Sequence, residues 1–149
     1  MKKNMRTAAK ALAVGAVAVA CMAAGTGSAS ALDRSVLPKG YSLNIGDRLL
    51  SPMDSTLRQY ELVLQSDGNL VEYRLDHGYR TKTCWASGTY GKPVHHATYQ
   101  QDGNFVLYGN DIYNTAYWAS NTVGVPGSTV NVNIGGAIYV GTKLYKGNC

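Results

Sequence analysis

Hydrophobic and polar residues alternate along much of the chain beyond residue 60, and glycines interrupt the alternation at short intervals. Because successive side chains of a strand point to opposite faces, this alternation predicts strands with one buried and one outward face. Helical spacing of apolar residues is absent, so we expect an all-β domain. The even positions of one stretch form the predicted core row, which is Leu62, Leu64 and Leu70. The odd positions form an outward row, which is Gln65, Asp67, Asn69, Val71 and Tyr73.

Two sequence motifs recur in the same order along the chain. Residues 65–73 recur as residues 100–108, and residues 85–91 recur as residues 118–124. The two offsets, 35 and 33 residues, are too similar to arise by chance. A degenerate third copy occupies residues 132–140. The domain therefore consists of three similar units.

The second unit repeats the alternation of the first. Its predicted core row is Tyr99, Phe105 and Leu107. Its outward row is Gln100, Asp102, Asn104, Val106 and Tyr108. Residues typical of hairpin turns occur at positions 76–78 and 110–111, where we expect the chain to reverse.

The first 31 residues have the three-part layout of a secretory signal peptide. A basic start, with Lys2, Lys3, Arg6 and Lys10, is followed by an apolar run over residues 11–24 and by small residues that end at Ala31. We expect cleavage after Ala31, which leaves one domain over residues 32–149. The apolar run is too short to span a bilayer comfortably, and no later segment is long enough, so membrane insertion is not expected.

The charge of the chain belongs mostly to this leader. The whole chain has 14 Lys and Arg against 9 Asp and Glu, a net charge of +5. Four of the bases and none of the acids precede residue 32, so the mature charge is only +1. No concentrated basic surface remains for nucleic acid, which is therefore not an expected partner.

The outward rows carry groups suited to binding sugars. Carboxamides, a carboxylate and a phenol can form several hydrogen bonds with neighbouring hydroxyls, and a charged acceptor such as Asp forms the stronger ones. Val and Tyr add apolar surface for the C–H patches of a pyranose ring. A single Asp-Gly-Asn segment would be an ordinary turn, but two copies with Gln, Val and Tyr at the same alternate positions argue for a binding function.

The pattern Gln-x-Asp-x-Asn-x-Val-x-Tyr resembles the mannose-binding signature of the bulb-type (monocot, snowdrop-lectin-like) lectin family. The Trp-Ala-Ser-Asn-Thr-x-Gly segment at residues 118–124 and the segment Leu37–Leu43 are also similar to that family. The match covers nearly all of residues 37–140. With the leader, it indicates a secreted bacterial member.

The resemblance implies a β-prism II fold, with three four-stranded sheets around a pseudo-threefold axis and with Trp85 and Trp118 packed centrally. It also implies roles for the outward row. Asp67 and Asn69 would bind the axial 2-hydroxyl of mannose. Gln65 would bind the 3-hydroxyl, Tyr73 would bind the 4-hydroxyl, and Val71 would pack against the ring. The row from Gln100 to Tyr108 would form a second, equivalent site.

The third unit departs from the signature. Its five aligned positions are Val132, Ile134, Gly136, Ile138 and Val140, which lack every polar ligand, so we predict no mannose binding there. Glu72 is a second departure, because the family usually has an apolar inward residue at that position.

Three cysteines are present, and Cys21 lies in the leader. Its context faintly resembles a lipoprotein cleavage box, but a soluble secreted protein is favoured. Cys84 and Cys149 remain, and export favours a disulfide between them. Cys149 follows the start of its repeat by 17 residues, as Tyr117 does, which suggests comparable repeat positions and a bridge across the pseudo-threefold. Such a bridge closes a loop of 66 residues and contributes about 4 kcal/mol in the chain-entropy model. Intermolecular pairing is the alternative.

Catalysis has little support in the sequence. His77, His95 and His96 are the only histidines, and neither metal-ligand spacing nor a nucleophile motif occurs, so no metal or cofactor is expected. Asp67 and Asp102 lie in equivalent repeats and do not form the facing pair that glycoside hydrolysis needs.

We therefore predict a lectin for mannose-containing glycans. The alternatives are a bacteriocin-type antibacterial lectin and a prism domain that mediates interactions without binding sugar. The sequence leaves the oligomeric state open, a homodimer included.

Overall fold

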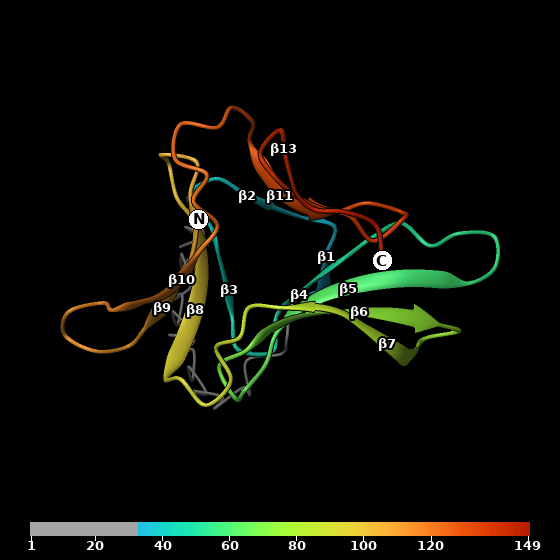
Figure 1. Cartoon of the computed structure of the whole chain (residues 1–149), viewed down its shortest axis with the longest axis horizontal. Coiled ribbons are helices and arrows are strands. Elements are labelled where there is room, and N and C mark those ends of the chain that lie inside the picture. The colour runs from blue at the N-terminus through green and yellow to red at the C-terminus, as the bar shows by residue number, and fades with distance from the viewer. Residues whose placement is uncertain (1–32) are drawn as a thin grey trace, which may run out of the picture.

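The computed structural model describes residues 33–149, and the predicted signal peptide and Cys21 lie outside this range. The described part is all-β, as predicted, and consists of three sheets around a common interior (Figure 1). The first sheet contains, in spatial order, β1 (Asp33–Arg34), β4 (Arg48–Leu50), β5 (Arg58–Leu64), β6 (Leu70–Asp76) and β7 (Tyr79–Ala86). The second contains β10 (Ala116–Ala119), β9 (Phe105–Gly109), β8 (Val94–Tyr99) and β3 (Ser42–Asn44). The third contains β13 (Lys143–Lys146), β12 (Ile138–Val140), β11 (Thr129–Val132) and β2 (Val36–Pro38).

The early strands connect the three sheets to one another. β2 pairs with β11, β3 pairs with β8, and β4 pairs with β5, so each of these consecutive strands enters a different sheet. Each sheet thus has four antiparallel strands, and the first gains a fifth because the short β1 pairs in parallel with β4. This arrangement confirms the predicted β-prism, with one additional strand.

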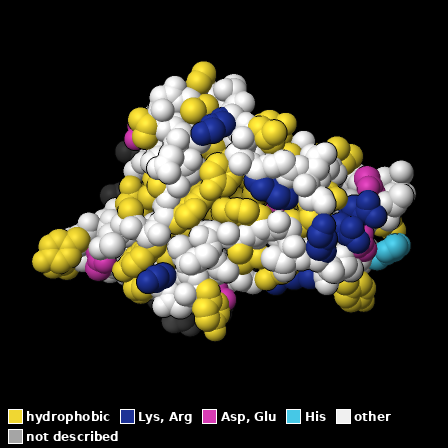
Figure 2. All heavy atoms as spheres, viewed as in Figure 1, with side chains coloured by type: hydrophobic (Ala, Val, Ile, Leu, Met, Phe, Trp, Pro, Cys, Tyr) yellow, Lys and Arg dark blue, Asp and Glu magenta, His cyan; other side chains and the backbone are white. Residues whose placement is uncertain are grey.

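The predicted core rows point into the interior that the sheets enclose. Leu62, Leu64 and Leu70 of the first sheet are fully buried. Apolar side chains fill the centre of the molecule in the view of Figure 2. The second and third sheets add buried side chains to the same cluster, among them Tyr99, Phe105, Leu107, Val130, Val132, Ile138 and Val140. One core therefore serves all three units.

An aromatic triad marks the pseudo-threefold axis. The ring centroids of Trp85 and Trp118 lie 5.6 Å apart, and Tyr145 lies 5.7 Å from the first ring and 5.5 Å from the second. All three contacts are edge-to-face, the geometry that aromatic pairs prefer. Central packing of the two tryptophans is confirmed, and Tyr145 of β13 takes the third place.

A disulfide joins Cys84 to Cys149 within the chain, as predicted, with 5.3 Å between the Cα atoms. The repeat-position argument for it was wrong, however. In the third sheet Tyr145 occupies the place of the tryptophans, so Cys149 lies in the tail beyond β13 and not at the position that matches Cys84.

Glu72 points inward, as the alternation predicted, and is fully buried. Lys146 Nζ lies 2.9 Å from Glu72 Oε2, so an ion pair replaces the expected apolar contact between the first and third sheets. Burial raises the pKa of Glu72, and the Lys146 ammonium opposes that effect.

Both predicted turns are present. His77 and Gly78 link β6 to β7 with positive φ angles of 54° and 83°, which suit a two-residue hairpin. Asp111 organises the loop between β9 and β10, because its Oδ1 accepts hydrogen bonds from Tyr113 N and Thr115 N at 3.0 Å each.

Candidate carbohydrate-binding sites

The two outward rows lie on the outer faces of two hairpins. Site one spans the end of β5, the following turn and β6, and consists of Gln65, Asp67, Asn69, Val71 and Tyr73. Site two occupies the equivalent part of β8 and β9, and consists of Gln100, Asp102, Asn104, Val106 and Tyr108. Within each set the structure brings the side chains together and repeats nearly the same contacts.

In each site a hydrogen bond joins the Gln side chain to the Tyr side chain. Gln65 Nε2 donates a hydrogen bond to Tyr73 Oη at 3.0 Å, and Gln100 Nε2 donates one to Tyr108 Oη at 2.6 Å. Since the phenol oxygen accepts in this contact, its own proton remains free to donate. The Gln carbonyl oxygen is likewise left as an acceptor for a ligand.

Each Asp is held by a tight turn. Asp67 Oδ1 accepts a hydrogen bond from Asn69 N at 2.9 Å, and Asp102 Oδ1 accepts one from Asn104 N at the same distance. The turn requires glycine, because Gly68 has a φ of 85° and a Cβ there would meet Lys92 O at 2.1 Å. Among residues 33–149 the second carboxylate oxygen of each Asp has no protein hydrogen bond and is free for a ligand.

Each Asn is oriented by the second repeated motif. Asn69 Oδ1 accepts from Ser87 Oγ at 3.0 Å and from Thr89 N at 3.1 Å. Asn104 Oδ1 accepts from Ser120 Oγ and from Thr122 N, both at 3.2 Å. The network assigns oxygen to the protein side and leaves Nδ2 as the free donor.

The sequence analysis missed these supporting residues as members of the site. Ser87 and Ser120 also have a structural role, because their hydroxyls accept hydrogen bonds from Leu70 N and Phe105 N. The signal was the recurrence of Trp-Ala-Ser-x-Thr after the outward rows of the first two units, which indicated a shared role without naming it.

Val71 and Val106 lie beneath the polar groups. Each is only 3% exposed, because neighbouring strands cover both sides of it. They form the floor of each site and offer a sugar ring less apolar area than an exposed side chain would.

The predicted alignment of the third unit with the first two is wrong by one residue. Val132 pairs with Ile138 as Leu64 pairs with Leu70, and Asn133 N donates to Ala137 O as Gln65 N donates to Asn69 O. The outward row of the third unit is therefore Asn133, Gly135, Ala137, Tyr139 and Gly141.

A slip of one position exchanges the two faces of a strand. Val132, Ile138 and Val140, which the sequence analysis placed in the outward row, instead pack into the core and are almost fully buried. Asn133 retains an amide, but its Oδ1 accepts from Gly135 N and Ala137 N at 2.9 Å each. Gly135, Ala137 and Gly141 stand where sites one and two have Asp, Asn and Tyr, and Tyr139 takes the place of the Val, so the third face still lacks the mannose set.

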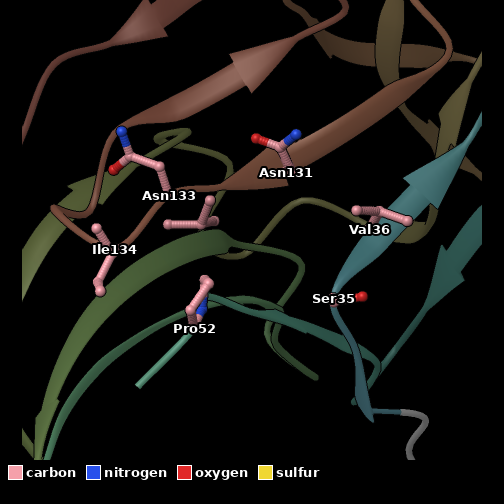
Figure 3. A pocket seen from close by; sticks show the side chains of 7 residues that line it. Ser35, Val36, Pro52, Asn131, Asn133 and Ile134 are labelled. Carbon is pink, nitrogen blue, oxygen red and sulfur yellow. The ribbon is translucent and has the colours of Figure 1, made fainter. Parts of the chain in front are cut away.

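A groove of about 450 Å³ opens beside the third face, between β2, β11 and the segment after β4 (Figure 3). Val36, Pro52, Val132 and Ile134 make it mostly apolar. The amides of Asn131 and Asn133 are turned away from it in Figure 3. The groove is therefore chemically unlike sites one and two.

Within residues 33–149, no group of three or more His, Cys, Asp or Glu side chains is placed to hold a metal ion. The same range contains no helix long and apolar enough to cross a membrane.

Solved structures that resemble this chain include plant lectins. The mannose-specific agglutinin of snowdrop (Galanthus nivalis) bulbs, in complex with methyl-α-D-mannoside, is 28% identical, with a TM-score of 0.58 and coverage of 73% of this chain and 90% of the agglutinin. A monomeric monocot mannose-binding lectin of Gastrodia elata is 32% identical, with a TM-score of 0.54 and coverage of 70% and 86%. A mannose-specific lectin of Dutch crocus (Crocus vernus) is 25% identical, with a TM-score of 0.59 and coverage of 74% and 90%. No protein-family model and no curated protein sequence matches the chain.

Three sheets around one core, with repeated polar rows on two outer faces, define a β-prism II protein. The chain belongs to the family of the monocot mannose-binding, or bulb-type, lectins, because it shares 32% identity with the Gastrodia elata lectin over 86% of that chain. The solved relatives at 25% identity or more are lectins, in agreement with the prediction of a non-enzymatic protein.

Proposed function

We propose that the protein is a secreted lectin that binds mannose-containing glycans through sites one and two. The observation that carries this proposal is the twofold recurrence of one arrangement. In both sites the Asn oxygen is bound to the protein while its Nδ2 stays free, and the Asp keeps one carboxylate oxygen for a ligand. Two identical sets of prepared donors and acceptors on outer faces favour a ligand rich in hydroxyls.

The arrangement suits mannose because a donor and an acceptor lie side by side. The free oxygen of Asp67 accepts a hydrogen bond from the axial 2-hydroxyl, while Asn69 Nδ2 donates one to the oxygen of that hydroxyl. Gln65 Oε1 accepts from the 3-hydroxyl, and Tyr73 Oη donates to the 4-hydroxyl. An equatorial 2-hydroxyl, as in glucose, would leave Asp67 and Asn69 without a ligand partner. Leaving polar groups desolvated and unpaired is the main source of discrimination against such an analogue.

Each site is a shallow strand face, so one mannose unit should bind weakly, with a Kd on the order of 1 mM, or about −4 kcal/mol. Useful affinity then requires both sites to engage one multivalent glycan, where linkage of the two events adds about a hundredfold or more. A mannose-rich, branched glycan fits this requirement better than a free monosaccharide.

Secretion is part of the proposal and is supported by the leader sequence alone. A basic start, an apolar run and small residues before position 32 are typical of export. Mass spectrometry of secreted material should find an N-terminus at or near Leu32, whereas an acylated Cys21 would show lipid anchoring instead.

A glycan array on the mature domain tests the ligand class. We expect binding to oligomannose structures and not to glucose- or galactose-terminated ones. An array without any sugar signal would favour an interaction domain that does not bind sugar. Killing of related bacteria by the same preparation would identify the antibacterial alternative.

A further inference from the structure

An arginine covers the tyrosine of site one. The guanidinium carbon of Arg80 lies 4.5 Å from the centre of the Tyr73 ring, within the range of a cation–π contact. Arg80 comes from β7 and Tyr73 from the neighbouring β6. Figure 2 shows charged side chains gathered at this end of the first sheet, where β5, β6 and β7 extend beyond the prism.

A buried carboxylate holds this arginine in place. Arg80 Nε donates a hydrogen bond to Oε1 of Glu61, which lies directly opposite Tyr73 on β5 and is 1% exposed. Glu61 Oε2 accepts from Arg48 Nη1 at 3.1 Å, and Arg48 is itself bound to Asp33. An unpaired charge at the depth of Glu61 would be costly, so the carboxylate restrains Arg80 over the ring.

Within residues 33–149, no lysine or arginine lies over the Tyr108 ring of site two. Tyr108 faces His96, with ring centroids 5.7 Å apart and an angle of 32° between the planes. On its other side, the register brings Ala116 of β10 beside Tyr108. β10 has 4 residues where β7 has 8, so the extension that carries Arg80 has no counterpart there. The two sites therefore share their ligand row and differ in what holds the tyrosine.

We propose that Arg80 is a positioning residue of site one, which fixes the Tyr73 ring so that its hydroxyl stays beside Gln65 and directed at the ligand. This inference rests on the proposed function, in which Tyr73 binds the sugar 4-hydroxyl. A phenol that is already restrained loses less conformational entropy on binding than a mobile one. Arg80 thus strengthens one hydrogen bond of the complex without touching the sugar.

The test isolates site one by using Asp102→Ala as the background. Titration calorimetry then compares methyl α-D-mannoside with its 4-deoxy analogue. Arg80→Gln removes the cation but keeps an N–H group for Glu61, and Arg80→Lys keeps the cation but loses the planar fork. Arg58→Gln is the matched control, because Arg58 lies on the same extension but bonds Asp76 instead.

We expect Arg80→Gln to weaken binding of the mannoside about three- to tenfold, which corresponds to a cation–π contact of ordinary strength. The 4-deoxy analogue should bind Arg80→Gln and the parent equally, since it lacks the hydroxyl that Tyr73 recognises. Arg80→Lys should recover part of the loss, and Arg58→Gln should show none. Equal losses for both sugars, or no loss for either, would overturn the proposal.

A second measurement needs no sugar. NMR of ¹³C-labelled tyrosine reports the ring-flip rate of Tyr73, which should rise at least severalfold in Arg80→Gln while that of Tyr108 stays unchanged. If the Asp102→Ala background binds no mannoside, the proposed function fails, and the ring-flip rate still decides whether Arg80 restrains Tyr73. An unchanged rate would refute the positioning role.

Discussion

Lys146 Nζ lies 2.9 Å from Glu72 Oε2 in the interior between the first and third sheets, where the two other units place apolar side chains. The two partners differ in their access to water. Glu72 is fully buried, whereas the Lys146 side chain is 16% exposed and also donates to Gly136 O at 3.2 Å. Neither Glu72 oxygen has a well-formed hydrogen bond within the described chain, so the lysine charge is what compensates its burial.

Removing Lys146 should therefore destabilise the fold more than removing Glu72. Lys146→Met leaves a buried carboxylate without compensation and should lower the free energy of unfolding by about 3 kcal/mol. Glu72→Leu leaves a lysine that can reach water, and should cost about 1 kcal/mol or less. The double variant should be close to wild type in urea unfolding. A double variant as unstable as Lys146→Met would contradict this account.

His96 should make stability depend on pH. Burial, and to a smaller extent His95, lowers the pKa of His96 below its ordinary value of 6.5. The unfolded chain therefore takes up this proton more readily than the folded one. The stability that neutral His96 permits is complete above pH 6.5, and it is lost as the pH falls through the lowered folded-state pKa. Its described ring neighbours, His95 and Tyr108, carry no negative charge that would offset protonation.

Thermal unfolding between pH 7 and pH 5 measures this effect. The midpoint should fall less in His96→Gln than in wild type, and His77→Asn at the exposed turn should behave as wild type does. Parallel pH curves for wild type and His96→Gln would show that His96 contributes nothing.

Asp67→Ala and Asp102→Ala should separate the two sites. Each variant removes the free charged acceptor of one site, so the stoichiometry of mannoside binding should fall from two to one. Avidity for a mannose-rich glycan should fall far more than twofold, because the second contact no longer contributes. The double variant should bind no mannose while its Trp fluorescence stays native. Mannose binding that persists in the double variant would place the sites elsewhere.

Ser87→Ala should damage site one without touching a ligand. The hydroxyl of Ser87 orients Asn69 and accepts from Leu70 N, so its loss frees the amide and leaves a buried N–H unpaired. We expect a loss of about 1–2 kcal/mol in stability and about tenfold weaker binding at site one, measured in the Asp102→Ala background. Ser66→Ala, at the exposed neighbour of Asp67, is the control. Unchanged mannoside affinity would show that Asn69 needs no such support.

The disulfide should stabilise a monomer. Cys84 and Cys149 are 65 residues apart in sequence. Replacing both with Ser should lower the free energy of unfolding by about 4 kcal/mol in the chain-entropy model. The oxidised wild type should run as a monomer on a non-reducing gel and show no free thiol. A covalent dimer that dithiothreitol reduces to monomers would mean that the bridge forms between chains.

Local periodicity was sufficient to predict much of this molecule. Alternation placed Leu62 and Leu64 in the core, and two nine-residue repeats identified the rows from Gln65 to Tyr73 and from Gln100 to Tyr108. These features depend on residues within one hairpin, so the spacing of nearby residues in the sequence predicts them. The Ser and Thr that orient each Asn were also visible as a repeat, although their role was not.

Other features were decided only when the sheets came together. The third unit has lost the polar signature, so matching it to the other repeats misaligned it by one position, and the pairing and burial of Val132 show the true register. The pairs of Glu72 with Lys146 and of Arg80 with Tyr73 have no periodic signature, because they join side chains through the fold. Local spacing determines which face a side chain takes, whereas only packing between strands and sheets determines which residue it meets there.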